Sequence, residues 1–339
     1  MSAAGALNPG LWTGDAARLR RMERTLLDLW AGKGYAEVIP PLLLPEVPVR
    51  AASPEALASR TLRLDANGEG SLALRADFTA GVALMAARRL ERLDGPRRLC
   101  YAGTVARRPA ADRPEGIETF QAGCERLSPE TGPEGDEEVA LLAAGSLAAL
   151  GIEDAVLELG HWGLVGPLME RLPWPEEARE ELEQALNRKS RPALESLMER
   201  HGECREARLL VRLLHLGGRP EAVEGLAPDL DAAGVLGAWR ELRALAAVLK
   251  KAFPGLPVRL DPTDVRHWSY YTGLTLKAFS RRHPFALLSG GRYDFLYPAL
   301  GRPFGACGFA LYLDRLLEAG RGLSAGSAPE GGVGCPASR

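Results

Sequence analysis

Apolar residues recur every three or four positions in two parts of the chain, which is the spacing of one helix face. The first part starts near Asp15 and places Leu19, Met22, Leu26 and Trp30 in step. The second is residues 163–253, where Leu, Ala, Glu and Arg dominate and a few glycines and prolines interrupt the pattern. The sequence therefore predicts a helix near the N-terminus and an all-helical insertion in the middle of the chain.

Strict alternation of apolar and polar residues predicts strands elsewhere. Between residues 99 and 127 one strand leads to Arg107, a loop follows, and a second strand carries Gln121 and Glu125 on one face. The opposite face holds Phe120, Ala122 and Cys124. The polar face either meets solvent or is buried against a ligand with hydrogen-bond donors, such as an imidazole, and the alternation leaves both readings open.

Several shorter runs also read as strands. Asn67-Gly68 between Thr61–Leu64 and Ser71–Leu74 predicts a hairpin. Single strands are predicted at Tyr35–Ile39, Ala155–Leu159, Val258–Leu260 and Gly308–Leu311. Helices and antiparallel pairs in one chain indicate a mixed α+β fold.

Composition narrows the class of protein. The 339 residues are 46% hydrophobic and 25% charged with a formal net charge of −2, so we expect a packed core and no general electrostatic grip on nucleic acid. The five cysteines form no CxxC pair, which argues against a zinc site and a disulfide framework. There is no signal-like N-terminus and no apolar run long enough for a membrane span. We therefore expect a cytoplasmic protein without metal or cofactor.

Four separated segments resemble the histidyl-tRNA synthetases, a branch of the class II aminoacyl-tRNA synthetases. GGRYD at 290–294, GFA at 308–310 and Arg315 are similar to the third class II motif. The other segments are GYAEVIPPLLLPE, similar to the first motif, residues 99–127, similar to the second, and DVRHWSYYTGLTLKAF at 264–279, similar to the histidine-specific segment. The resemblance covers about residues 15–318 and implies an antiparallel sheet flanked by helices. The first motif implies a dimer interface.

The resemblance also implies a set of histidine-binding side chains. Asp77, Thr79 and Gln121 would hold the ammonium group, while Glu125 and Tyr271 would meet the imidazole. Two adjacent tyrosines on a strand point to opposite faces, so only one of Tyr270 and Tyr271 is expected in the pocket. The full candidate set is Asp77, Thr79, Arg107, Gln121, Glu125, Arg266, Tyr270, Tyr271 and Tyr293.

The nucleotide side of the resemblance is degraded. Glu115 and Ile117 stand where the enzymes carry two ATP-binding arginines, and Pro109 replaces an acidic residue. A carboxylate repels a triphosphate that an arginine would attract. Tyr312 stands where the enzymes have a glycine. The family that keeps the amino-acid half and loses the ATP half is that of the regulatory subunits of short-form ATP phosphoribosyltransferase.

That resemblance implies no catalysis of its own, a complex with the short catalytic subunit, self-dimerisation, and feedback by L-histidine; tRNA is not an expected partner. A truncated ligase that activates histidine with ATP is the alternative, and a dimer with a vestigial pocket is a third reading. The implied division is a core of residues 1–162 and 254–319, a helical insertion at 163–253, and a flexible tail at 320–339.

Overall fold

The structure is a computed structural model, and it describes residues 10–53, 55–65, 70–109, 116–130, 132–216, 219–264 and 270–320. The predicted Asn67-Gly68 turn, Glu115 and Arg266 lie outside these residues, as does the predicted tail beyond residue 320. Among the described helices, none is long and apolar enough to cross a membrane.

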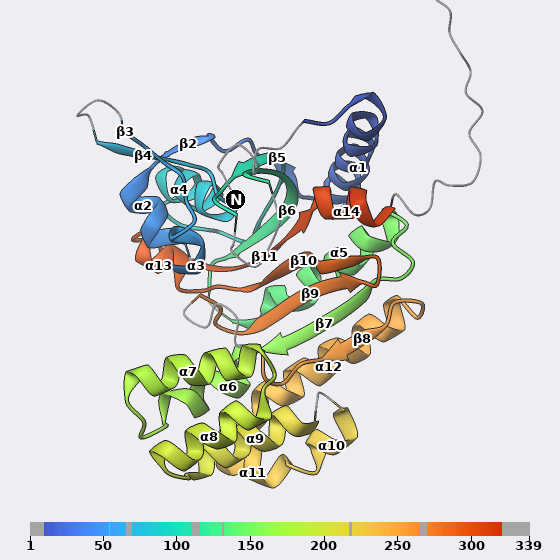
Figure 1. Cartoon of the computed structure of the whole chain (residues 1–339). Coiled ribbons are helices and arrows are strands. Elements are labelled where there is room, and N and C mark those ends of the chain that lie inside the picture. Colours follow the sequence, from blue (N-terminus) through green and yellow to red (C-terminus); the bar gives the residue numbers. More distant parts are fainter. Residues whose placement is uncertain are drawn as a thin grey trace, which may run out of the picture.

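An eight-stranded sheet forms the centre of the molecule (Figure 1). Its strand order is β1-β5-β6-β11-β10-β9-β7-β8, and every neighbouring pair is antiparallel except β1 with β5 and β7 with β8. The strands are β1 (Ala36–Glu37), β5 (Arg97–Ala106), β6 (Glu118–Ser128), β7 (Val156–His161), β8 (Val258–Leu260), β9 (Leu274–Ser280), β10 (His283–Arg292) and β11 (Gly305–Tyr312). The expected α+β class with a mainly antiparallel sheet is confirmed.

A second, three-stranded sheet lies beside the first in the order β2-β4-β3. Its strands are β2 (Leu43–Pro45), β3 (Arg63–Asp65) and β4 (Ser71–Leu74). The predicted antiparallel pairing is confirmed, because β3 and β4 align Leu64 with Leu72. The predicted strand at Tyr35–Ile39 is shorter than expected, because β1 spans only Ala36–Glu37. The Val38 N–H still donates to the Cys100 carbonyl of β5, and Pro40-Pro41, which have no N–H groups, follow.

Helices cover the two faces of the large sheet differently. One face packs against α1 (Thr13–Ala31), α5 (Asp136–Ala149), α12 (Leu236–Ala252) and α14 (Leu313–Gly320). Trp30 of α1 meets Phe309 of β11 edge to face at 6.0 Å between ring centroids. The predicted alternation in β6 is confirmed there, because Ala122 and Cys124 lie in this main core. The short remaining helices of this half are α2 (Glu46–Ala52), α3 (Glu55–Ala58), α4 (Thr79–Arg89), α13 (Leu296–Ala299) and the 3-10 turn Pro133–Gly135.

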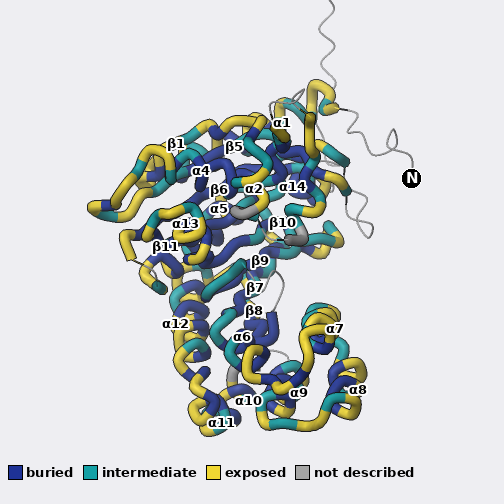
Figure 2. The backbone as a smooth tube through the Cα atoms, turned by 90° about the vertical axis from the view of Figure 1, so that its left-hand side faces the viewer, coloured by how far each residue is buried: buried dark blue, intermediate teal, exposed yellow. Residues whose placement is uncertain are grey.

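A run of helices separates β7 from β8 and forms a lobe below the sheet (Figures 1 and 2). Its members are α6 (Trp162–Glu170), α7 (Glu176–Asn187), α8 (Arg191–His201), α9 (Arg205–Leu216), α10 (Pro220–Glu224), α11 (Ala227–Ala232) and α12. Its apolar positions are buried as the helical spacing requires, with Leu182, Leu210 and Trp239 at 0–2% exposure. The last helix, α12, packs back on β7 and β8, so the lobe is joined to the sheet by contact as well as by chain connection.

A substitution at Gly308 of β11 would measure how tightly the centre of the sheet is packed. A methyl group there would collide with the Cys124 backbone oxygen and the Glu125 carboxylate. We expect Gly308→Ala to lower the free energy of unfolding by about 1–3 kcal/mol, as overpacking does. Gly237→Ala, in open space on α12, is the control and should raise it by about 0.5–1 kcal/mol. Equal denaturant midpoints for the two variants would contradict this account.

Candidate functional site

One row of residues crosses four strands of the large sheet on the face away from α5 and α12. The register aligns Glu125 with Gly308, Gly308 with Gly291, and Gly291 with Thr275. Each missing side chain leaves room for a neighbour: the Glu125 carboxylate lies where a Cβ of Gly308 would point, and the Tyr271 ring lies beside Gly291. The two glycines therefore form a floor on which larger polar side chains lie flat.

Glu125 is the centre of this arrangement and is 1% exposed. Its Oε1 accepts hydrogen bonds from Thr79 Oγ1 at 2.8 Å and Tyr101 OH at 3.1 Å. The Tyr293 hydroxyl donates to its Oε2. The predicted polar face of β6 is thus buried against hydroxyl groups rather than exposed to solvent.

Burial raises the pKa of Glu125 to about 8, and the nearby Asp77 charge raises it further, although the Thr79 and Tyr101 hydroxyls oppose the shift. The carboxyl is therefore largely protonated at neutral pH. A cationic group placed beside it would favour the charged form. The site is consequently arranged to gain from a ligand that brings positive charge.

Asp77 and Thr79 stand at the start of α4, as expected. Asp77 Oδ1 accepts a hydrogen bond from the Ala80 backbone N–H at 3.2 Å, so this side chain also caps the helix. Burial raises the pKa of Asp77, while Arg107 and Arg75 oppose the rise. Thr79 bonds to Glu125, so the residues predicted for the two ends of histidine meet each other in this structure.

Gln121 lies on β6, and Arg107 directly follows the neighbouring strand β5. Gln121 is 2% exposed, and its Oε1 has no hydrogen-bond partner among the described residues. A buried amide oxygen without a donor is costly, so a ligand N–H at this position would be stabilising. Arg107 Nη1 donates to the Ala76 carbonyl at 3.2 Å, next to Asp77.

The two tyrosines before β9 depart from expectation. Tyr270 and Tyr271 lie in a turn rather than on a strand, so the rule of opposite faces does not apply to them. The Tyr270 ring stacks on Tyr293 at 5.2 Å between centroids and meets Tyr271 edge to face at 5.3 Å. Burial raises the pKa of both phenols, and the charges of Asp77 and Glu125 add to it. Both rings therefore lie next to the same acidic residues, and the expected strand with the two rings on opposite faces is not formed.

Tyr312, the last residue of β11, lies next to two arginines. Its ring lies under the Arg315 guanidinium at 3.9 Å and 5.8 Å from that of Arg107. Its hydroxyl is 2.7 Å from Ser289 Oγ. Arg315 also donates to the Ala286 carbonyl. Arg107 and Arg315 therefore both contact other groups of this chain.

A buried ion pair closes the far end of the same face. Lys277 and Asp264 are 8% and 5% exposed, and the Lys277 ammonium bonds to the Asp264 carboxylate. Thr275 Oγ1 donates to the same carboxylate at 2.7 Å. The structure shows that the lysine is neutralised by an acid from the segment after β8.

Sequence reasoning missed Tyr101. It lies on β5 opposite Gly123, whose lack of a side chain leaves space for the Tyr101 hydroxyl. The signal was present as a glycine between Gln121 and Glu125, but only the pairing register shows which side chain uses the gap. Among the described residues, no group of His, Cys, Asp or Glu could hold a metal ion.

This fold, with a carboxylate on its central antiparallel strands and hydroxyls around it, is that of a class II aminoacyl-tRNA synthetase core. The histidyl-tRNA synthetase family model matches residues 11–316. The chain is 34% identical to the ATP phosphoribosyltransferase regulatory subunit of Gluconobacter oxydans, over 91% of this chain and 79% of that protein. It is also 34% identical to the subunit of the same name from Bordetella petrii, over 89% and 78%.

Solved structures agree with these sequence matches. A Bacillus halodurans protein described as an ATP phosphoribosyltransferase regulatory subunit/histidyl-tRNA synthetase superposes with a TM-score of 0.82 at 27% identity, over 92% of this chain and 81% of that one. A histidine–tRNA ligase subunit from Alicyclobacillus acidocaldarius gives 0.76 at 29%, over 93% and 97%. The chain therefore belongs to the histidyl-tRNA synthetase family and, within it, to the ATP phosphoribosyltransferase regulatory subunits.

The raised pKa of Glu125 generates a prediction for stability against pH. The pKa of Glu125 in the folded protein, about 8, lies above that of an ordinary glutamate. Its contribution to the free energy of unfolding is therefore present in full at low pH and is lost as pH rises towards 8. The loss is at most about 1.4 kcal/mol per pH unit. Glu125→Gln should therefore flatten the decline in unfolding free energy between about pH 4.5 and 8. Denaturant titrations at several pH values measure it, and parallel curves for both proteins would refute it.

Proposed function

We propose that this chain is the non-catalytic regulatory subunit of an ATP phosphoribosyltransferase in the cytoplasm, and that it binds L-histidine at the Glu125 site. Its family supports the first part, because the relatives are named as regulatory subunits. Tyr312, held between two arginines, supports the absence of histidine activation, because the ring fills space that a nucleotide would need.

The observation that carries histidine binding is the pair of buried carboxyls at Asp77 and Glu125. Burial raises both pKa values, and no basic side chain is among the groups that shift the pKa of Glu125. Histidine brings an ammonium group and two imidazole N–H groups, which suit two acids and the unpartnered Gln121 oxygen. Tyr270, Tyr271 and Tyr293 supply aromatic faces. Arg107 and Arg266 complete the candidate set.

The decisive experiment combines this chain with a short-form catalytic subunit and measures phosphoribosyl transfer with and without histidine. We expect the catalytic subunit to be activated by this chain and the complex to be inhibited by histidine more strongly than the catalytic subunit alone. Binding at two sites on one assembly is reciprocal, so the phosphoribosyl donor should weaken histidine binding by the same factor, typically about 5–150-fold. No activation and no extra inhibition would refute the regulatory role.

Variants of the pocket separate histidine binding from complex formation. Each charge-assisted hydrogen bond contributes about 1.5–3 kcal/mol, so Glu125→Ala and Asp77→Ala should each weaken histidine binding at least about ten-fold in calorimetry. Glu130→Ala, exposed just beyond β6, is the control and should leave affinity unchanged. Unchanged affinity in both pocket variants would place the ligand elsewhere. Histidine-dependent pyrophosphate exchange into ATP would instead support the ligase alternative.

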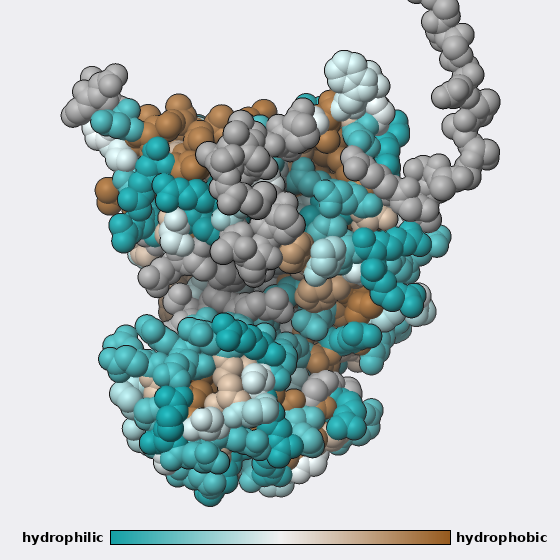
Figure 3. All heavy atoms as spheres, viewed as in Figure 1, coloured by the Kyte–Doolittle hydropathy of each residue, from teal (hydrophilic) through white to brown (hydrophobic). Residues whose placement is uncertain are grey.

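A self-dimer is the second part of the proposal. The segment from β1 to α2 exposes a set of apolar side chains that a monomer leaves in water: Ile39 at 86%, Val47 at 80%, Leu42 at 48% and Leu43 at 46%. Hydrophobic residues gather over β2 at the upper edge of the molecule (Figure 3). Contiguous exposed apolar surface of this kind is typical of protein interfaces. The same segment resembles the first class II motif.

We expect Ile39→Asp to shift the protein from dimer to monomer in sedimentation, because a charge at the centre of a buried apolar interface is not solvated. Phe295→Asp, on a 68% exposed residue beyond β10, is the matched control and should stay dimeric. A monomeric wild-type protein at micromolar concentration, or dimers in both variants, would contradict this assignment of the interface.

A further inference from the structure

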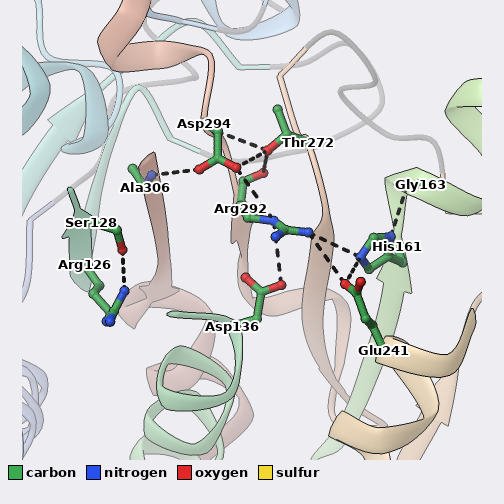
Figure 4. Close-up of polar contacts among 10 residues, drawn as sticks. All are labelled: Arg126, Ser128, Asp136, His161, Gly163, Glu241, Thr272, Arg292, Asp294 and Ala306. Carbon is green, nitrogen blue, oxygen red and sulfur yellow. Dashed lines mark hydrogen bonds and ion pairs between the residues drawn. The ribbon is translucent and has the colours of Figure 1, made fainter. Parts of the chain in front are cut away.

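Arg292 of the GGRYD segment does not reach the Glu125 site. In the ladder it is paired with Cys307, a residue of the main core, so it points to the opposite face of the sheet. Its guanidinium lies where a Cβ of Gly273 would be. Figure 4 shows it extending between Asp136 of α5 and the pair formed by His161 and Glu241. A cation that is 6% exposed on this face has no part in the histidine site.

The hydrogen bonds of Arg292 are incomplete. His161 Nδ1 accepts from the Gly163 backbone N–H at 3.0 Å, so the neutral imidazole carries its proton on Nε2. Burial and the Arg292 charge lower the pKa of His161 to about 4, which keeps the ring neutral. The contact of 3.4 Å between Arg292 Nη2 and His161 Nε2 therefore joins two donors.

The acids around the guanidinium stay at long range. Arg292 Nε is 3.7 Å from Asp136 and 3.9 Å from Asp294, and Nη2 is 4.0 Å from Glu241. Nε has no hydrogen-bond partner among the described residues. Two buried donors, Arg292 Nη2 and His161 Nε2, thus converge on one point. The acid next to it in the described part of the chain is Glu241, at 3.3 Å from the imidazole. A single well-placed acceptor would satisfy both.

A cavity of about 200 Å³ opens beside this point, between the sheet, α5 and α12. Drug-sized ligands need about 300–1,000 Å³, so this volume suits a smaller molecule. One wall is apolar and consists of Leu242, Leu245 and Val248 of α12 with Leu274 of β9. The remaining lining includes His161 and the acids Asp136, Glu137 and Glu241.

The acidic residues of the lining also favour binding of a positively charged group in the cavity. Asp136 is 7% exposed, its Oδ1 has no hydrogen-bond partner among the described residues, and burial raises its pKa to about 7. Glu137, the next residue, is exposed at the rim. Donors for an anion, acids for a cation and an apolar wall therefore surround one small space.

We propose that this cavity binds a small zwitterion, an α-amino acid with an apolar side chain, at a site separate from that of Glu125. The ligand carboxylate would accept from His161, which lines the cavity, and from Arg292 Nη2, which lies 3.4 Å behind the imidazole. Its ammonium group would lie against Asp136 and Glu137, and its side chain against the apolar wall on α12. This site does not depend on the proposed histidine site or on the regulatory role.

Glu241 acts as a stand-in for the ligand carboxylate. It lies 3.3 Å from His161 Nε2 and 4.0 Å from Arg292 Nη2, yet its side chain is 49% exposed, so it can turn out to solvent when a ligand arrives. The site then competes with a contact between the helical lobe and the sheet. Neutralising Glu241 should therefore strengthen ligand binding rather than weaken it.

The test uses three probes of the same shape on the full-length protein: L-leucine, 4-methylpentanoate and 3-methylbutylamine. We expect saturable binding of leucine in ligand-observed NMR, and binding at least about ten-fold weaker for the two probes that lack one charge. Equal binding of leucine and either single-charge probe, or no leucine binding up to its solubility, would overturn the proposal.

Variants locate the site. Ala244→Trp places a ring in the mouth of the cavity from an exposed helix position and should abolish leucine binding, whereas Ala247→Trp, exposed outside the lining, should leave it unchanged. Glu241→Gln should raise leucine affinity several-fold, and Glu125→Ala should not alter it. Loss of leucine binding in Glu125→Ala, or equal binding in the two tryptophan variants, would overturn the assignment. Both tryptophan variants keep Arg292, so they test the site without removing a buried charge.

Discussion

The buried carboxyl of Glu125 is the constraint on which the rest of the site depends. It has room because Gly308 has no side chain, and the hydroxyls of Thr79, Tyr101 and Tyr293 supply its hydrogen bonds. Those three hydroxyls come from α4, β5 and the end of β10. One acid therefore fixes how the first helix after the small sheet, the central strands and the GGRYD segment meet. Without a donor from each, burial of the group would be far more costly.

The alternation of strand residues and the spacing of helix residues predicted part of this site and of the core. Alternation placed Gln121 and Glu125 on one face of β6, and helical spacing placed Leu19, Leu26 and Trp30 in the core. Tyr270 and Tyr271 were misjudged because a turn replaces the strand there, so both rings face the same acids. Tyr101 was missed because a glycine signals only that space exists. The register between β5 and β6 shows which side chain takes it.

The contacts of Tyr312 follow the same packing rules. Its ring has partners in Arg315 beneath it and Ser289 beside it. Arg315 on α14 is bound to this ring and to a backbone carbonyl. An arginine whose contacts are taken by a neighbouring ring and a carbonyl is a weaker phosphate ligand than a free one. This physical reading agrees with relatives that are named regulatory subunits.

Because side chains alternate along β10 and into the next residues, the GGRYD segment places its side chains on both faces of the sheet. Tyr293 turns to the Glu125 side, where its hydroxyl bonds to the carboxylate, while Arg292 turns to the α5 and α12 side. On the first face, three hydroxyl groups surround the single carboxyl of Glu125. On the second, a guanidinium lies among acids that are all too far for short bonds. The two faces share this strand, but each side chain has its own set of partners. Adjacent residues of one short motif therefore belong to two separate groups of side chains.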